Sequence, residues 1–246
     1  MNGSVSSRPV CLTIGGSDSC GGAGIQADLR VFDALGVHGC SAITALTAQN
    51  PLAVTHIEPV SLAQLDAEIH AVFDYYDVAV VKTGMLVDAE HIALISALLD
   101  QLHRGGLVID PVLVSSTGRP LLDSGAIGTL IDALIPLATL ISPNFDEADA
   151  LLGKRSDHSS TTVMEMADRL NCAVLLTGGH HEGEQLTDRL CDDDGVLYEF
   201  KHARQVWNRD HCHGTGCRLA SAISANLAHG KSLPRAVEIA VTYIQH

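Results

Sequence analysis

The chain has 246 residues, of which 46% are hydrophobic and 18% are charged. That apolar content is enough for a large core, and the charge content is too low for a disordered chain. Lys and Arg number 15 and Asp and Glu 29, so the net charge is −14. Nucleic acid and anionic membrane surfaces are therefore excluded as expected partners, because both carry negative charge themselves.

The cysteines and the N-terminal segment bear on where the protein works. Seven cysteines are spread along the chain without a CxxC pair, and the polar residues 1–9 contain no apolar signal segment. No uncharged apolar run is long enough to span a membrane. These features predict a cytoplasmic protein in which the thiols stay reduced, with a flexible segment over residues 1–9.

Apolar runs alternate with segments of helical periodicity along the whole chain. Strands are predicted at 10–15, 41–46, 78–81, 107–110, 140–142 and 173–176, and a hairpin at 187–191 with 196–200. Helices are predicted at 23–36, 61–73, 88–102, 125–135, 162–170, 215–228 and 233–243. Continuously apolar strands between helices indicate a mostly parallel sheet covered on both faces. We therefore expect one α/β domain over residues 1–246, a three-layer α/β/α sandwich.

In such a fold, ligands bind beyond the carboxyl ends of the strands, in the turns that lead into the helices. The turn before residue 215 carries the strongest pattern, because Gly214 and Gly216 bracket Thr215 where a helix is predicted to begin. Backbone N–H groups at a helix start attract anions such as a phosphoryl group in transfer. Cys217 lies in the same first turn, where the helix field is expected to lower the pKa of its thiol so that it accepts a hydroxyl proton.

Two other interpretations of this turn remain open. The glycines can simply begin a helix, with Cys217 as a small core residue. Alternatively, His211, Cys212, His213 and Cys217 can bind a metal, although their spacing matches no standard zinc site.

The remaining turns carry polar side chains suited to a substrate. The turn 15–24 is rich in glycine but lacks the Gly-Lys-Ser/Thr ending of a P-loop, and Asp28 follows it. Gln49 offers an amide that can pair with the edge of a heterocycle. Asp110 and Glu147, with Asn144, can hold Mg²⁺ through water beside a phosphate. A capping box at 144–147 is the alternative interpretation of Asn144 and Glu147, and both roles can coexist.

The motifs together resemble the hydroxymethylpyrimidine/phosphomethylpyrimidine kinases of thiamine biosynthesis, in the ribokinase superfamily. The matching stretches are GGSDSCGGAGIQADLR (15–30), GCSAITALTAQN (39–50), VKTGML (81–86), DPVLVSSTGRPLL (110–122), SPNFDEADALL (142–152), TGGH (177–180) and HGTGCRLASAISANLAHG (213–230). They occur in the order typical of that family. The resemblance implies a ribokinase-like fold and a kinase that uses ATP and Mg²⁺ to phosphorylate the hydroxymethyl group of 4-amino-5-hydroxymethyl-2-methylpyrimidine, its monophosphate, or both.

The resemblance also implies a role for each matching residue. Gln49 would bind the pyrimidine edge, in a pocket lined by Gly16, Asp28, Met85 and Val112. The nucleotide would contact Asn144, Thr177, Gly179, Thr215 and Arg218. Asp110 and Glu147 would serve the metal, Gly214 and Gly216 with the Cys217 amide would form the anion hole, and Cys217 would be the base.

Two departures from the family pattern affect the nucleotide side. The family usually has lysine where this chain has Thr177, and threonine where it has Arg218. We hypothesise that Arg218 partly replaces the missing cation. A pyridoxal-type kinase and a non-catalytic pyrimidine-binding sensor remain alternatives, and family analogy predicts a homodimer or a higher homo-oligomer.

Overall fold

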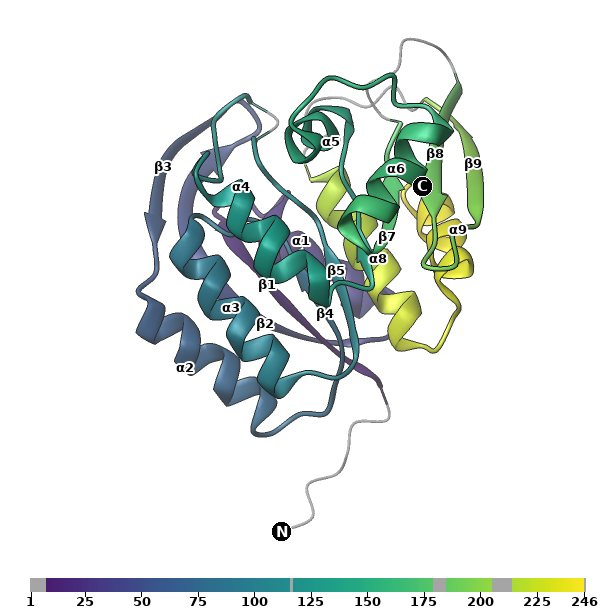
Figure 1. The fold of residues 1–246 in the computed structure, drawn as a ribbon. Helices are drawn as coiled ribbons and strands as arrows, with labels where there is room; N and C mark the ends of the chain where they lie inside the picture. The colour runs from purple at the N-terminus through teal and green to yellow at the C-terminus, as the bar shows by residue number, and fades with distance from the viewer. Residues whose placement is uncertain (1–7, 116, 179–184, 205–213, 246) are drawn as a thin grey trace.

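Among the residues that the structure describes, a single sheet of nine strands, in the order β3-β2-β1-β4-β5-β6-β7-β8-β9, forms the middle layer (Figure 1). The computed structural model describes residues 8–115, 117–178, 185–204 and 214–245. The strands are β1 Val10–Asp18, β2 His38–Asn50, β3 Ala53–Pro59, β4 Val78–Thr83, β5 Gly106–Ile109, β6 Leu140–Ile141, β7 Ala173–Leu176, β8 Gln185–Cys191 and β9 Leu197–Ala203.

The six inner strands β2, β1, β4, β5, β6 and β7 are parallel to one another. At one edge β3 is antiparallel to β2, and at the other β8 is antiparallel to β7 and β9 to β8. The expectation of a mostly parallel sheet is therefore confirmed, as is the predicted hairpin, which pairs Cys191 with Leu197. The predicted strand at 41–46 is part of the longer β2, and β3 was not predicted. β3 is an edge strand whose residues are largely exposed, so its sequence lacks the continuous apolar run of the inner strands.

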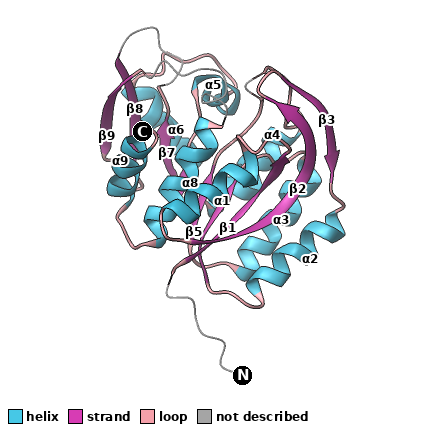
Figure 2. Ribbon diagram, turned by 180° about the vertical axis from the view of Figure 1, so that it is seen from behind, coloured by secondary structure: helices cyan, strands magenta, loops and turns pink. Residues whose placement is uncertain are grey.

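Helices cover both faces of the sheet, as the front and back views show (Figures 1 and 2). One face carries α1 Gly24–Ala34, α8 Thr215–Ala228 and α9 Leu233–Tyr243. The other face carries α2 Leu62–Phe73, α3 Ala89–Leu102, α4 Ala126–Thr129, α5 Phe145–Leu152 and α6 Ser160–Leu170. This arrangement gives the expected three layers.

Two predicted helices differ in detail from those observed. The predicted segment 125–135 divides into α4, a π-helical turn at Leu130–Leu134 and a 3-10 turn at Ile135–Leu137. Pro136 lies in the last of these, where it lacks the N–H that would continue an α-helix. α6 begins at Ser160 and not at 162, because the Ser159 hydroxyl caps it by accepting the Thr162 N–H at 3.4 Å.

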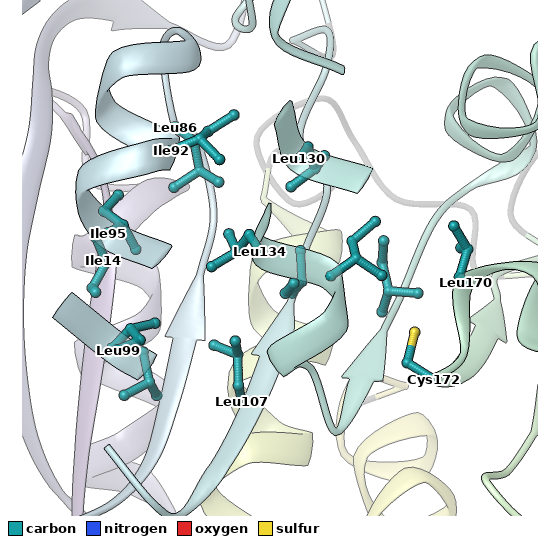
Figure 3. Packing of buried hydrophobic residues seen from close by; sticks show 14 of the residues in the cluster. Ile14, Leu86, Ile92, Ile95, Leu99, Leu107, Leu130, Leu134, Leu170 and Cys172 are labelled. Atoms are coloured by element: carbon teal, nitrogen blue, oxygen red, sulfur yellow. The ribbon is translucent and has the colours of Figure 1, made fainter. Parts of the chain in front are cut away.

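The larger of two apolar clusters packs between the sheet and the layer of α2 to α6 (Figure 3). Ile14 and Leu107 from the strands meet Ile95 of α3 and Leu134 of the π-helical turn, and all four are fully buried. Close packing of this kind fixes the strand ends, and therefore the turns that follow them, in rigid positions. Within the described residues, no helix has the length and hydropathy needed to cross a membrane.

Candidate active site

A cavity of about 1000 Å³ opens at the carboxyl ends of the parallel strands. Its lining brings together the last residues of β1 and β2, residues from the turns after β1, β4, β5, β6 and β7, and the first turn of α8. The predicted residues that line it are Gly16, Asp28, Gln49, Met85, Asp110, Val112, Asn144, Glu147, Thr177, Gly214, Thr215, Gly216 and Cys217. Arg218 is not among the lining residues, and Gly179 lies outside the described residues, as do His211, Cys212 and His213.

The glycine-rich turn before α1 and the one before α8 contact each other at the start of α8. Gly214 has φ +84°, and a Cβ atom there would lie 2.2 Å from the carbonyl oxygen of Gly22. Only glycine fits this position, both because of its left-handed conformation and because of the close approach. Gly214 is the N-cap residue of α8 and provides no side-chain cap, and Gly216 and Cys217 of the first helical turn line the cavity.

Asp18 shapes the first of these turns from within. Its carboxylate accepts the backbone N–H groups of Cys20 and Ala23, each at 2.8 Å, and its side chain is almost completely buried. It therefore stabilises the turn before α1 and does not face a ligand with free oxygens.

A buried ionic cluster lies beneath the cavity between β1, β4, α1 and α8. Lys82 donates to both carboxylate oxygens of Asp28, at 3.1 and 3.0 Å, and lies 3.8 Å from Asp110 Oδ2. Thr13 and Ser221 donate to the same Asp28 carboxylate at 2.6 and 2.7 Å. Burial alone would lower the pKa of Lys82, but the carboxylates of Asp28 and Asp110 more than offset it, so the pKa is raised and the side chain stays charged.

The same cluster contradicts the expected low pKa of the Cys217 thiol. Burial raises that pKa to about 12, and the negative charges of Asp110 and Asp28 add to the effect, although Lys82 opposes it. The helix field does not compensate for losing the hydration of a thiolate beside two carboxylates. Cys217 therefore rests as a thiol at neutral pH.

The turn before α5 forms the capping box that the sequence allowed. Asn144 Oδ1 accepts the Glu147 N–H at 3.0 Å, and the Glu147 carboxylate accepts the Asn144 N–H at 2.9 Å. Burial and then the negative charge of Asp110 raise the pKa of Glu147 to about 8. Burial likewise raises the pKa of Asp110, whose Oδ2 is one of two buried side-chain polar atoms that lack a partner among the described residues.

Two buried carboxylates that repel each other beside a cavity are a donor set suited to a divalent cation. Within the part of the chain that the structure describes, no third acidic, histidine or cysteine side chain completes a ligand cluster. Mg²⁺ usually retains several waters and takes phosphate oxygens as further ligands, so one or two carboxylates suffice. Asp110 and Glu147 therefore fit a magnesium ion that arrives with a nucleotide.

The raised pKa of Glu147 predicts a pH dependence of stability that Glu147→Gln removes. Because the folded carboxyl holds its proton up to about pH 8, the unfolded state binds fewer protons than the folded state above pH ~4.3. The wild-type free energy of unfolding should therefore fall relative to the variant as the pH rises from 5 to 8, by at most about 1.4 kcal/mol per unit. Gln keeps the capping box. Urea unfolding without magnesium measures this, and parallel curves for the two proteins would contradict it.

The residues that the sequence predicts to bind the heterocycle also line this cavity. The backbone of Gln49 is fixed by Ser19, whose hydroxyl donates to its carbonyl at 2.9 Å and accepts its N–H at 3.0 Å. A Cβ atom at Gly16 would lie 3.0 Å from the Met85 sulfur, so the two residues are in close contact. Gln49 and Val112 line the same cavity as Gly16 and Met85. Asp28 differs from them, since four hydrogen bonds already occupy its two carboxylate oxygens.

A polar group that sequence reasoning missed lies near Thr177. Asp188 of β8 accepts the Gly178 N–H at 2.7 Å and pairs with His202 of β9 at 3.1 Å. The hydrogen bond to Asp188 raises the pKa of His202, and both residues line the cavity. The one sequence signal for this pair is an Asp within the predicted hairpin strand, where acidic residues are uncommon. The hypothesis that Arg218 replaces the missing cation stays a prediction.

A mostly parallel sheet, an open helix start and carboxylates that converge on one cavity define a ribokinase-like phosphotransferase. The family model described as phosphomethylpyrimidine kinase matches residues 18–246. The chain belongs to this family.

Named relatives agree with that assignment. A hydroxymethylpyrimidine/phosphomethylpyrimidine kinase of Rhizobium meliloti is 43% identical over 96% of this chain and 88% of its own length. One of Haemophilus influenzae is 41% identical over 95% of this chain and 88% of its own length. The expected enzyme class, a hydroxymethylpyrimidine/phosphomethylpyrimidine kinase, is confirmed by these matches.

Solved structures match the fold across nearly the whole chain. A phosphomethylpyrimidine kinase from Clostridium difficile is 36% identical with a TM-score of 0.83, covering 97% of this chain and 98% of that chain. A pyridoxal kinase from Bacillus subtilis, solved as an ADP complex, is 31% identical with a TM-score of 0.86. The match covers 97% of this chain and 91% of that chain. The sequence relatives and the fold therefore agree, while the fold alone does not distinguish the pyrimidine from the pyridoxal kinases.

Proposed function

We propose that this chain transfers the γ-phosphoryl group of ATP to the hydroxymethyl group of 4-amino-5-hydroxymethyl-2-methylpyrimidine, and a second group to the resulting monophosphate. The observation that supports this most directly is that one cavity contains both the Gln49 and Met85 region and the open start of α8. A heterocycle bound at the first and a phosphate bound at the second would lie within the same cavity.

Each side chain then has a defined task. The Gln49 amide, which can both donate and accept, would pair with the ring edge of the pyrimidine. The N–H groups at Gly214, Gly216 and Cys217 would bind the transferring phosphoryl group as its negative charge grows. Because the Cys217 thiol is protonated at rest, only its small thiolate fraction would act as the base. That thiolate would take the hydroxyl proton and become the thiol as the alcohol oxygen bonds to phosphorus.

The nucleotide would lie toward the turns that contain Asn144, Thr177 and Thr215, with Gly179 beyond the described residues as a further candidate. Asp110 and Glu147 would hold Mg²⁺, which supplies charge neutralisation for the phosphate oxygens when bound. We further propose that the protein works in the cytoplasm as a homodimer or a higher homo-oligomer.

A direct assay tests the proposed function. The purified protein is given ATP and Mg²⁺ with the free pyrimidine alcohol, its monophosphate, or pyridoxal, and ³¹P NMR identifies the products. We expect both pyrimidine compounds to be phosphorylated and pyridoxal to react more slowly. Tight pyrimidine binding without any phosphorylated product would instead identify a sensor, the alternative from another class, and faster reaction with pyridoxal would identify a pyridoxal kinase.

We expect Gln49→Leu to weaken pyrimidine binding more than it slows the chemical step. The apolar side chain cannot replace the hydrogen bonds of the amide, so the polar ring edge would be left unpaired. The KM for the pyrimidine should rise about 10- to 100-fold with kcat changed by less than about threefold. Gln64→Leu, on the exposed side of α2, is the matched control. An unchanged KM would exclude Gln49 from pyrimidine recognition.

A further inference from the structure

Lys82 is a buried, charged side chain that lines the cavity. It is only 1% exposed and is among the largest fully buried side chains of the protein. An ammonium group has three N–H donors, and within the described residues its hydrogen bonds all go to Asp28. At least one donor is therefore available to a further acceptor, although burying an unsatisfied polar group costs free energy.

An unsatisfied acceptor lies next to this donor. Asp110 Oδ2 is buried without a hydrogen-bond partner among the described residues, at 3.8 Å from Lys82 Nζ. That separation is too long for a direct hydrogen bond. One oxygen atom placed about 2.8 Å from each would satisfy both.

The local backbone keeps this gap open. A Cβ atom at Gly84 would lie 3.1 Å from Lys82 Nζ, so the absence of a side chain there leaves room beside the ammonium. Gly84, Lys82, Asp110 and Cys217 all line the cavity. Asp28 anchors the ammonium from below, and is itself held by Thr13 and Ser221.

The charges select the kind of group that fits the gap. Lys82 contributes one positive charge, and Asp28 and Asp110 contribute two negative charges at 3.0 and 3.8 Å from it. Before Mg²⁺ and the nucleotide bind, a phosphate oxygen placed there would meet net negative charge. A neutral hydroxyl can accept from the ammonium and donate to the carboxylate, and so satisfies both without adding charge.

We propose that Lys82 and Asp110 together bind the hydroxyl group of the free pyrimidine alcohol, with Lys82 donating to the reacting oxygen. The hydroxyl hydrogen bonds to Asp110 in the bound alcohol and passes to the Cys217 thiolate in the transfer step. This inference rests on the proposed function and adds a catalytic residue to it, because Lys82 would touch the atom that is phosphorylated. Asp28 is then a positioning residue that holds the ammonium, and not a residue that contacts the pyrimidine.

The test compares the pyrimidine alcohol with its 5-methyl analogue, which lacks only the hydroxyl. Calorimetry without nucleotide gives the Kd of each for the wild type, for Lys82→Met, and for the double variant Lys82→Met with Asp28→Asn. The double variant removes both charges of the pair, because a single change would leave Asp28 buried and unpaired. Lys154→Met, an exposed residue paired with Glu165, is the control.

We expect the wild type and the Lys154→Met control to prefer the alcohol at least tenfold. The double variant should bind both compounds equally and turn over at least 100-fold more slowly. A double variant that keeps the preference for the alcohol would overturn the inference. A wild type that binds the alcohol and its 5-methyl analogue equally would also overturn the inference. This comparison does not depend on whether any variant folds.

The outcomes also separate this inference from the proposed function. A wild type that phosphorylates the pyrimidine, together with a double variant that does so at the same rate, refutes only the role of Lys82. A wild type that phosphorylates neither pyrimidine compound refutes the proposed function, whatever the hydroxyl preference shows.

Discussion

Gly214→Ala should reduce kcat/KM for ATP by about 10²- to 10³-fold, the size of effect seen when one donor is lost from an anion-binding hole. A Cβ at this position would lie 2.2 Å from the Gly22 carbonyl oxygen and 2.9 Å from the Ala23 Cα. Both are backbone atoms, so the turn itself must move. The first N–H groups of α8 would then lose their alignment on the phosphoryl group. Steady-state kinetics with ATP as the varied substrate measures the loss.

Gly36→Ala is the matched control for this variant. Gly36 also has a positive φ, +74°, but a Cβ there would meet no atom within 4 Å. Both variants therefore carry the strain of alanine in a left-handed conformation, about 1 kcal/mol or somewhat more, and only Gly214→Ala adds the clash. Equal activity in the two variants would exclude the start of α8 from phosphate binding.

Cys217→Ala should lower kcat by about 10²- to 10⁴-fold if the sulfur takes the hydroxyl proton, the range for a lost acid-base group. The KM for the pyrimidine should change by less than about threefold, because the proton moves only in the transition state. Steady-state kinetics on the pyrimidine alcohol gives both constants. Cys40→Ala, a half-buried cysteine on β2 outside the cavity lining, is the control and should keep wild-type kinetics.

The raised pKa of Cys217 adds a signature in the pH profile. A base with a pKa of about 12 is almost fully protonated at neutral pH, and its thiolate fraction grows tenfold with each pH unit below that value. The wild-type kcat/KM should therefore climb through pH 9 without reaching a plateau, whereas the Cys217→Ala profile should be flatter. If Cys217→Ala lost little activity and its pH profile matched that of the wild type, Cys217 would be a packing residue and not the base. Phosphoryl transfer would then depend on positioning and charge alone.

The sequence alone predicted most of the strands and helices along the chain, and the family, because both depend on local patterns of residues. Apolar runs alternating with helical periodicity specify the inner strands and their covering helices, as the buried patterns of β1, β4 and β5 show. The edge strand β3 was missed because an exposed strand has no continuous apolar run. The glycine turns and the residues Gln49, Asp110 and Cys217 stood out because their residue types are unusual at strand ends and helix starts.

What only the tertiary structure decided is how charges from distant segments meet. Lys82 ends an apolar strand and looks in the sequence like a solvated lysine, yet it is buried between Asp28 and Asp110, which are 54 and 28 positions away along the chain. The pKa of Cys217 follows from the same meeting, because burial beside carboxylates outweighs the helix field that local sequence suggests. Desolvation and Coulomb interactions depend on distances in space, and linear spacing does not encode them.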